Sequence, residues 1–139
     1  MQLAVFVVED NAEIHENLVG ALEELTCVKV VGGTATEEGA LEWVAGNNHW
    51  DMLIVDLFLK GGSGMRLVQR VQRARPEQKI IVFSNYVNAS VRKRCAQLGV
   101  DAVFDKSTEI DALVDYCSHQ CTQLGAQDVT PQHPSGGTA

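Results

Sequence analysis

The sequence predicts an α/β fold in which a doubly wound, five-stranded parallel sheet is covered by five helices on its two faces. Short apolar runs rich in branched residues alternate five times with segments of helical periodicity between residues 3 and 125. Parallel strands require crossover helices, and these helices bury both faces of the sheet. We expect one domain, residues 1–125, followed by a flexible tail over residues 126–139, where Pro, Gly and Ser are frequent.

The expected strands are apolar runs that end at a polar residue or a glycine. They cover residues 3–8, 28–31, 52–56, 79–83 and 102–104. In the third run, four apolar residues precede Asp56 and a glycine-rich loop follows, which is typical of a fully buried strand. Reactive groups gather outside the carboxyl ends of the strands in an open parallel sheet, so we expect a functional site to form around Asp56.

The expected helices have apolar residues every three or four positions and a start or stop signal at each end. Asn11 caps a helix that runs to Leu25, and either Thr34 or Thr36 starts a second helix that ends at residues 46–48. The other signals are Pro76, before which the third helix stops, Gly99, which closes the fourth, a capping box of Thr108 and Asp111 for the fifth, and Gly125 at its end.

Composition and charge exclude two classes of protein. No apolar run approaches the roughly 20 residues that span a bilayer, and the formal net charge of −7 argues against non-specific nucleic-acid binding. We therefore expect neither membrane insertion nor a nucleic-acid partner. The four cysteines, without a secretory signal, indicate free thiols and a cytoplasmic location. Cys117 and Cys121 lie on the apolar stripe of the last helix, which favours core packing over metal binding.

Polar side chains follow four of the expected strands. They are Glu9 and Asp10 after the first strand, Asp56 after the third, Ser84 after the fourth and Lys106 after the fifth. If these four strands are neighbours, the five side chains converge on one pocket. Three carboxylates repel one another unless a cation intervenes, and Mg²⁺ prefers such oxygen ligands. The hydroxyl and the ammonium would then meet a phosphoryl group attached to Asp56.

On these residues, the chain resembles response-regulator receiver domains over residues 2–124. The segments that carry the resemblance are residues 8–11, 54–57, 62–64, 83–84 and 104–106. Each segment is a weak signal alone, and the set is specific. The resemblance implies a flavodoxin-like (βα)5 fold with strand order 2-1-3-4-5. It also implies a phosphorylation-dependent switch in two-component or phosphorelay signalling.

The resemblance also implies a role for each site residue. Asp56 matches the phosphoacceptor, and the implied Mg²⁺ ligands are Glu9, Asp10, Asp56 and the backbone carbonyl of Phe58. Ser84 and Lys106 match the residues that bind the phosphoryl group and start the switch. The implied phosphodonor is a histidine kinase or a histidine phosphotransfer protein.

The output is expected at the surface of residues 86–120, which holds the fourth helix, the fifth strand and the fifth helix. No DNA-binding segment follows the last helix, so we expect output through an unidentified downstream protein, through a homodimer, or through both. The chemistry expected is limited to self-catalysed phosphoryl transfer and autodephosphorylation, rather than that of a conventional enzyme.

Three departures from the family pattern concern the switch region. Val103 stands where the family usually has a mobile aromatic residue, although Phe104 is adjacent. Ser107 replaces a proline, so the usual cis peptide bond is not expected there. Phe58 and Tyr86 are bulky where many relatives have small or polar residues, and we expect them to affect the access of water to the phosphoryl group and hence its lifetime.

Two other functions are consistent with parts of this pattern. A small Mg²⁺-dependent aspartyl-phosphate hydrolase would need a second carboxylate shortly after Asp56, and Leu57 and Phe58 occupy those positions. A pseudo-receiver that binds partners without phosphorylation is disfavoured because all five site residues are present.

Overall fold

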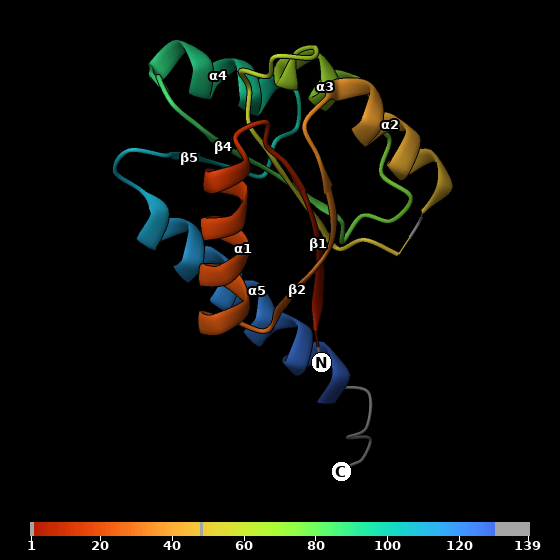
Figure 1. The fold of residues 1–139 in the computed structure, drawn as a ribbon. Helices are drawn as coiled ribbons and strands as arrows, with labels where there is room; N and C mark the ends of the chain where they lie inside the picture. Colours follow the sequence, from red (N-terminus) through yellow and green to blue (C-terminus); the bar gives the residue numbers. More distant parts are fainter. Residues whose placement is uncertain (1, 48, 130–139) are drawn as a thin grey trace.

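A computed structural model describes residues 2–47 and 49–129 and has five parallel strands in the order β2-β1-β3-β4-β5 (Figure 1). This confirms the predicted fold class and strand order. The strands are β1 (Leu3–Val8), β2 (Val28–Thr34), β3 (Met52–Val55), β4 (Lys79–Ser84) and β5 (Ala102–Asp105). The helices are α1 (Ala12–Leu25), α2 (Glu37–Gly46), α3 (Gly64–Arg70), α4 (Ala89–Gln97) and α5 (Ile110–Val129). No helix in these ranges is long and apolar enough to cross a membrane.

Helices α1 and α5 lie on one face of the sheet, and α2, α3 and α4 lie on the other (Figure 1). Strand β3 is buried along its whole length, and its residues alternate between the two layers. Met52 and Ile54 pack with α1 and α5. Leu53 and Val55 pack with the helices of the opposite face. A strand covered on both sides has no polar position, which explains the unbroken apolar run in the sequence.

The sheet register brings the strand ends together. Val8 pairs with Val55, and Ser84 pairs with Asp105. The residues that follow β1, β3 and β5 therefore meet at one edge of the sheet, beside the last residue of β4. This edge also lies next to the N-terminus of α1, where the Asn11 side chain accepts a hydrogen bond from the Ile14 backbone N–H, as its sequence position predicts.

Strand β2 is longer than predicted, because it continues through Gly32 and Gly33 to Thr34. The two glycines pair with Phe6 and Val7 of β1. A Cβ atom on Gly33 would lie 2.3 Å from the His15 ring and 3.0 Å from the Val7 carbonyl oxygen, so a side chain at this position would require the His15 ring to move. The glycines are therefore part of the strand rather than its end.

Two helix ends also differ from the predictions. Helix α3 ends at Arg70, well before Pro76, and Val71 is already extended. The buried Gln78 side chain holds the following segment, since its Oε1 accepts from the backbone N–H groups of Ala74 and Arg75 and its Nε2 donates to the distant Trp50 carbonyl at 2.9 Å. Helix α5 continues past Gly125 to Val129. The remainder of the predicted tail, residues 130–139, lies outside the described residues.

The prediction of four free thiols is wrong, because Cys27 and Cys121 form a disulfide. The turn between α1 and β2 packs beside α5 and brings the two Cα atoms to 5.9 Å, within the usual range for a disulfide. Cys95 and Cys117 are free and buried. Cys117 packs in the core, as predicted, and its burial raises the pKa of the thiol to about 12.

Candidate functional site

Asp56 lies directly after β3 and is 6% exposed. Its backbone N–H donates to the Val8 carbonyl at 3.0 Å, which continues the pairing of β1 and β3. Its Oδ1 accepts a 2.6 Å hydrogen bond from Ser84 Oγ and a 3.1 Å hydrogen bond from the Phe58 backbone N–H. Its Oδ2 lies 2.8 Å from Lys106 Nζ. Both carboxylate oxygens are therefore held by groups from other parts of the sheet edge.

Glu9 and Asp10 follow β1 and lie beside Asp56. Glu9 is buried, forms an ion pair with Lys106, and accepts from the Asn11 backbone N–H at 3.0 Å. Asp10 is half-buried, and its Oδ2 accepts a 2.6 Å hydrogen bond from the Lys60 backbone N–H. The sequence predicted these two acids as part of the site, and the Lys60 contact was not predicted.

The three carboxylates form one acidic cluster. One oxygen from each of Glu9, Asp10 and Asp56 lies within 4.8 Å of the others. A set of hard oxygen donors at this spacing is suited to Mg²⁺, which binds one or two carboxylates and keeps several waters. The donor chemistry of the cluster therefore fits the metal that the sequence predicted.

Lys106 and Ser84 provide the positive charge and the hydroxyl of the site. Burial of the Lys106 ammonium lowers its pKa, but hydrogen bonds to Asp56 and Glu9 outweigh this effect and raise the pKa above 10.5. Ser84 is fully buried, and its Oγ also accepts from the Leu57 backbone N–H at 3.3 Å. The Ser84 carbonyl accepts from the Lys106 backbone N–H at 3.0 Å, so the two residues are linked directly.

Two exposed aromatic side chains stand at the mouth of the site. Phe58 and Tyr86 are 57% and 83% exposed, and their rings meet edge to face at 6.2 Å. Tyr86 has a φ of 60°, a left-handed conformation that is uncommon for a bulky residue. Together with the acidic cluster, Asn85 and Lys106, these rings line a pocket of about 490 Å³. Asn85 was not among the predicted site residues.

The two other predicted switch residues pack on opposite faces of the sheet. Val103 is partly buried against the layer of α2, α3 and α4. Phe104 is partly buried on the other face and meets Tyr116 of α5 edge to face at 5.8 Å. No cis peptide bond occurs in residues 2–47 and 49–129, in agreement with the replacement of proline by Ser107.

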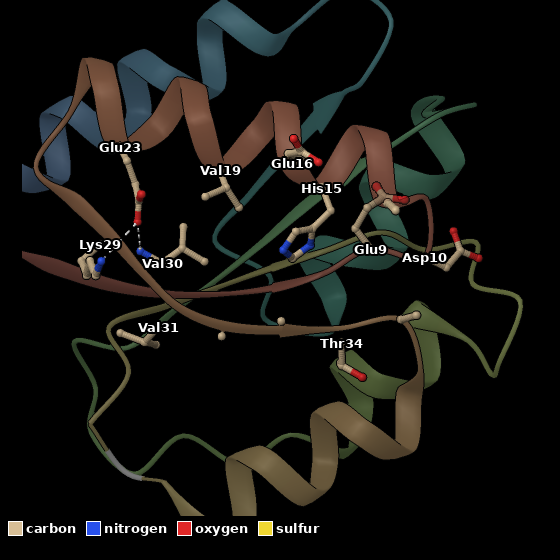
Figure 2. A pocket seen from close by; sticks show the side chains of 14 residues that line it. Glu9, Asp10, His15, Glu16, Val19, Glu23, Lys29, Val30, Val31 and Thr34 are labelled. Carbon is tan, nitrogen blue, oxygen red and sulfur yellow. Dashed lines mark hydrogen bonds and ion pairs between the residues drawn. The ribbon is translucent and has the colours of Figure 1, made fainter.

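A second, larger pocket of about 740 Å³ lies between α1 and the edge strand β2 (Figure 2). Glu9 and Asp10 lie at one end of it, and Glu23 at the other end accepts from the Val30 backbone N–H at 2.9 Å. Gly32 and Gly33 leave its floor without side chains. Asp56 and Lys106 do not line this groove, so the predicted site corresponds to the smaller pocket.

The protein-family comparison finds that a model of the response regulator receiver domain matches residues 5–118. Among curated proteins, the response regulator UvrY of Escherichia coli K12 is 24% identical over 102 residues, which are 73% of this chain and 46% of that protein. The DNA-binding transcriptional regulator NtrC of Azospirillum brasilense is 27% identical over 111 residues, 79% of this chain and 22% of that protein. The chain thus spans less than half of these relatives.

Solved structures share the fold at low sequence identity. The REC domain of AraT, a response regulator from Geobacillus stearothermophilus, has a TM-score of 0.74 and 24% identity, and the match covers 92% of this chain and 99% of that chain. A response regulator from Burkholderia pseudomallei, whose structure contains a phosphorylated aspartic acid, a calcium ion and citrate, has a TM-score of 0.70 and 18% identity, with 94% and 75% covered.

Proposed function

Because the chain belongs to the response regulator receiver domain family, we propose that it is a signalling switch in which Asp56 accepts a phosphoryl group. The phosphodonor is the phosphohistidine of a histidine kinase or of a histidine phosphotransfer protein. Since that phosphohistidine is made from ATP, we also propose a cytoplasmic location. The disulfide means that the cysteines no longer support this location.

The observation that carries the proposal is the environment of the Asp56 carboxylate. A hydroxyl and an ammonium contact its two oxygens, Ser84 Oγ at 2.6 Å and Lys106 Nζ at 2.8 Å. These groups supply a hydrogen-bond donor and a positive charge where negative charge would increase on phosphorylation. The Burkholderia pseudomallei relative with its phosphorylated aspartic acid supports the same chemistry in a protein of this fold.

In the proposed transfer, an Asp56 oxygen attacks the phosphorus of the donor. A P–O bond forms as the donor's P–N bond breaks, and the bonding electron pair returns to the imidazole nitrogen. Lys106 balances the charge on the phosphoryl oxygens, and Ser84 donates a hydrogen bond to one of them. Phe58 and Tyr86 limit the access of water and so lengthen the lifetime of the aspartyl phosphate.

The metal ligands in this proposal are Glu9, Asp10, Asp56 and the Phe58 backbone carbonyl. Mg²⁺ bound there supplies charge neutralisation for the phosphoryl oxygens. The protein's part is to hold the carboxylates together: the Asn11 N–H orients Glu9, and the Lys60 N–H orients Asp10.

The proposed output is a change at the α4–β5–α5 surface. Arg92 of α4 connects its parts, since it donates to the Val103 carbonyl at 2.9 Å and to the Glu109 carboxylate at 2.8 Å. Glu109 also accepts from the Asp105 backbone N–H, next to Lys106, at 2.9 Å. A shift of Lys106 on phosphorylation would therefore reach α4 through Asp105 and Glu109. With no aromatic side chain at Val103, the loop of residues 84–86 and Phe104 carry the change.

We propose that this surface binds a downstream protein or a second copy of the chain, and that it binds no nucleic acid. The DNA-binding function in the name of the Azospirillum relative belongs to that protein, of which the present chain spans 22%.

The test is incubation with acetyl phosphate and Mg²⁺ followed by intact-protein mass spectrometry. We expect an adduct of about 80 Da, the mass added by one phosphoryl group. Asp56→Asn should abolish it, and Asp51→Asn, a partly exposed acid at the opposite end of the sheet, should retain it. An adduct of equal yield on Asp56→Asn would overturn the assignment.

A further inference from the structure

Glu37 is a buried carboxylate outside the proposed site. It is the first residue of α2, is 2% exposed, and binds two arginines of α3. Its Oε1 lies 2.8 Å from Arg66 Nη2, and its Oε2 accepts from Arg66 Nε and Arg70 Nη1, each at 2.8 Å. The hydrogen bond from Arg66 is the largest of the effects that lower the pKa of Glu37 to about 2. The side chain is therefore charged at neutral pH.

Glu37 also binds the backbone of the loop between β3 and α3, residues 56–63. Its Oε1 accepts from the Ser63 N–H at 2.9 Å, and its own backbone N–H donates to the Gly61 carbonyl at 3.0 Å. Gly62, with a φ of 113°, packs against the Glu37 side chain so closely that a Cβ atom there would lie 2.5 Å from Glu37 Cβ. One residue thus fixes three consecutive residues of the loop.

The other part of the same loop contacts the acidic cluster. The Phe58 N–H donates to Asp56 Oδ1 at 3.1 Å, and the Lys60 N–H donates to Asp10 Oδ2 at 2.6 Å. The two parts are joined, because Phe58 and Ser63 form an antiparallel bridge across the loop. The contacts of Glu37 with the loop therefore continue through Ser63 and Phe58 to Asp56.

We propose that Glu37 is a positioning residue for the phosphoryl-acceptor site. It holds the loop so that the backbone at Phe58 and the Lys60 N–H stay in place against Asp56 and Asp10. Arg66 and Arg70 compensate its charge and prevent it from turning out to solvent. This inference rests on the proposed function, because it assigns Glu37 a role in metal binding at that site.

The variant Glu37→Gln distinguishes two roles of Glu37: positioning the loop of residues 56–63, or only joining α2 to α3. Glutamine keeps the length of the side chain and an oxygen for the Ser63 N–H, but it loses the charge that binds the arginines. The matched control is Glu38→Gln, since the neighbouring Glu38 is 69% exposed at its side chain and contacts Arg70 at 3.3 Å. Arg66→Gln is a second variant, which removes a partner of Glu37 without changing the buried carboxylate.

Two measurements are made on each protein. Metal-free amide exchange should accelerate in residues 57–63 of Glu37→Gln by about 10-fold or more, while the amides of β1 and β4 keep their wild-type rates. Mg²⁺ affinity, measured by calorimetry without a phosphodonor, should fall by about 10-fold, as it does when residues that support metal ligands are removed. Arg66→Gln should show the same pattern more weakly, and Glu38→Gln should match the wild type.

Two results would overturn the inference. One is unchanged exchange in residues 57–63. The other is a uniform loss of stability with wild-type Mg²⁺ affinity, which would identify Glu37 as a structural contact only. If Glu37→Gln does not fold, Arg66→Gln decides by the same two criteria. A wild-type protein that binds Mg²⁺ but is not labelled by acetyl phosphate would refute the proposed function alone, because neither measurement here uses phosphorylation.

Discussion

Replacement of Lys106 by methionine tests whether its ammonium offsets the charge of the acidic cluster. Lys106 Nζ contacts both Glu9 and Asp56. All three side chains are buried, with exposed fractions of 8% for Lys106, 3% for Glu9 and 8% for Asp56. Removal of one partner of a buried ion pair costs about 3–5 kcal/mol, because the other charge is left uncompensated. Asp56 keeps its bond from Ser84, and Glu9 keeps its bond from Asn11. We therefore expect the lower end, about 3 kcal/mol without metal.

Mg²⁺ should reverse much of this loss. At a concentration 100 times its Kd, a ligand stabilises the folded state by about 2.7 kcal/mol. In Lys106→Met the cation also replaces the missing positive charge, so its affinity and the stability that it adds should both exceed those of the wild type. The assay is urea unfolding followed by circular dichroism, in EDTA and in Mg²⁺. Lys93→Met, a change at an exposed lysine of α4, is the matched control.

The pH dependence provides an independent check. Because the pKa of Lys106 is raised above 10.5 in the folded protein, the stability that its ammonium adds is complete below 10.5 and is lost as the pH rises through the folded-state pKa. The difference between the wild type and Lys106→Met should therefore stay constant from neutral pH to about 10 and decrease above it. Equal stability of the two proteins in EDTA, or an equal gain from Mg²⁺, would refute the reasoning.

Three further predictions concern other parts of the chain. Asp10→Asn should raise metal-free stability by up to about 1 kcal/mol by reducing repulsion, since the amide oxygen can still accept from the Lys60 N–H. It should also abolish the response of the melting temperature to Mg²⁺. A lower metal-free melting temperature with an intact Mg²⁺ response would show that the carboxylates do not share a site. Tyr86→Gly should raise stability by about 1 kcal/mol in thermal unfolding, because glycine adopts the left-handed conformation of this exposed residue without strain. Tyr86→Ala should give no gain, and a destabilised glycine variant would contradict the argument. Alkylation of the denatured, unreduced protein should modify two cysteines, and alkylation after reduction should modify four. Loss of the Cys27–Cys121 disulfide, which joins residues 94 positions apart, should lower the free energy of unfolding by up to about 4 kcal/mol. Four reactive thiols without reductant would show that the disulfide does not form.

The sequence by itself determined the features that depend on residues close together in the chain. The unbroken apolar run before Asp56 predicted a strand buried on both faces, and Asn11 predicted the start of α1, because a cap needs only an oxygen near the first turn. The alternation of strands and helices predicted parallel pairing. Parallel pairing gathers the carboxyl ends of the strands at one edge, and the strand order implied by the family resemblance makes β1, β3, β4 and β5 neighbours, so the convergence of Glu9, Asp56 and Lys106 was predicted without any knowledge of their contacts.

Tertiary structure decided the features that depend on neighbours distant in the chain. A glycine pair normally indicates a turn, but Gly32 and Gly33 lie in a strand because they pair with Phe6 and Val7 of β1. Glu37 is at the first position of a helix, where a glutamate is typically exposed to solvent and its negative charge interacts favourably with the helix dipole. It is buried because α3 brings Arg66 within 2.8 Å. Cys27 and Cys121 meet because the packing of α5 against the sheet closes a separation of 94 residues, which no local pattern encodes.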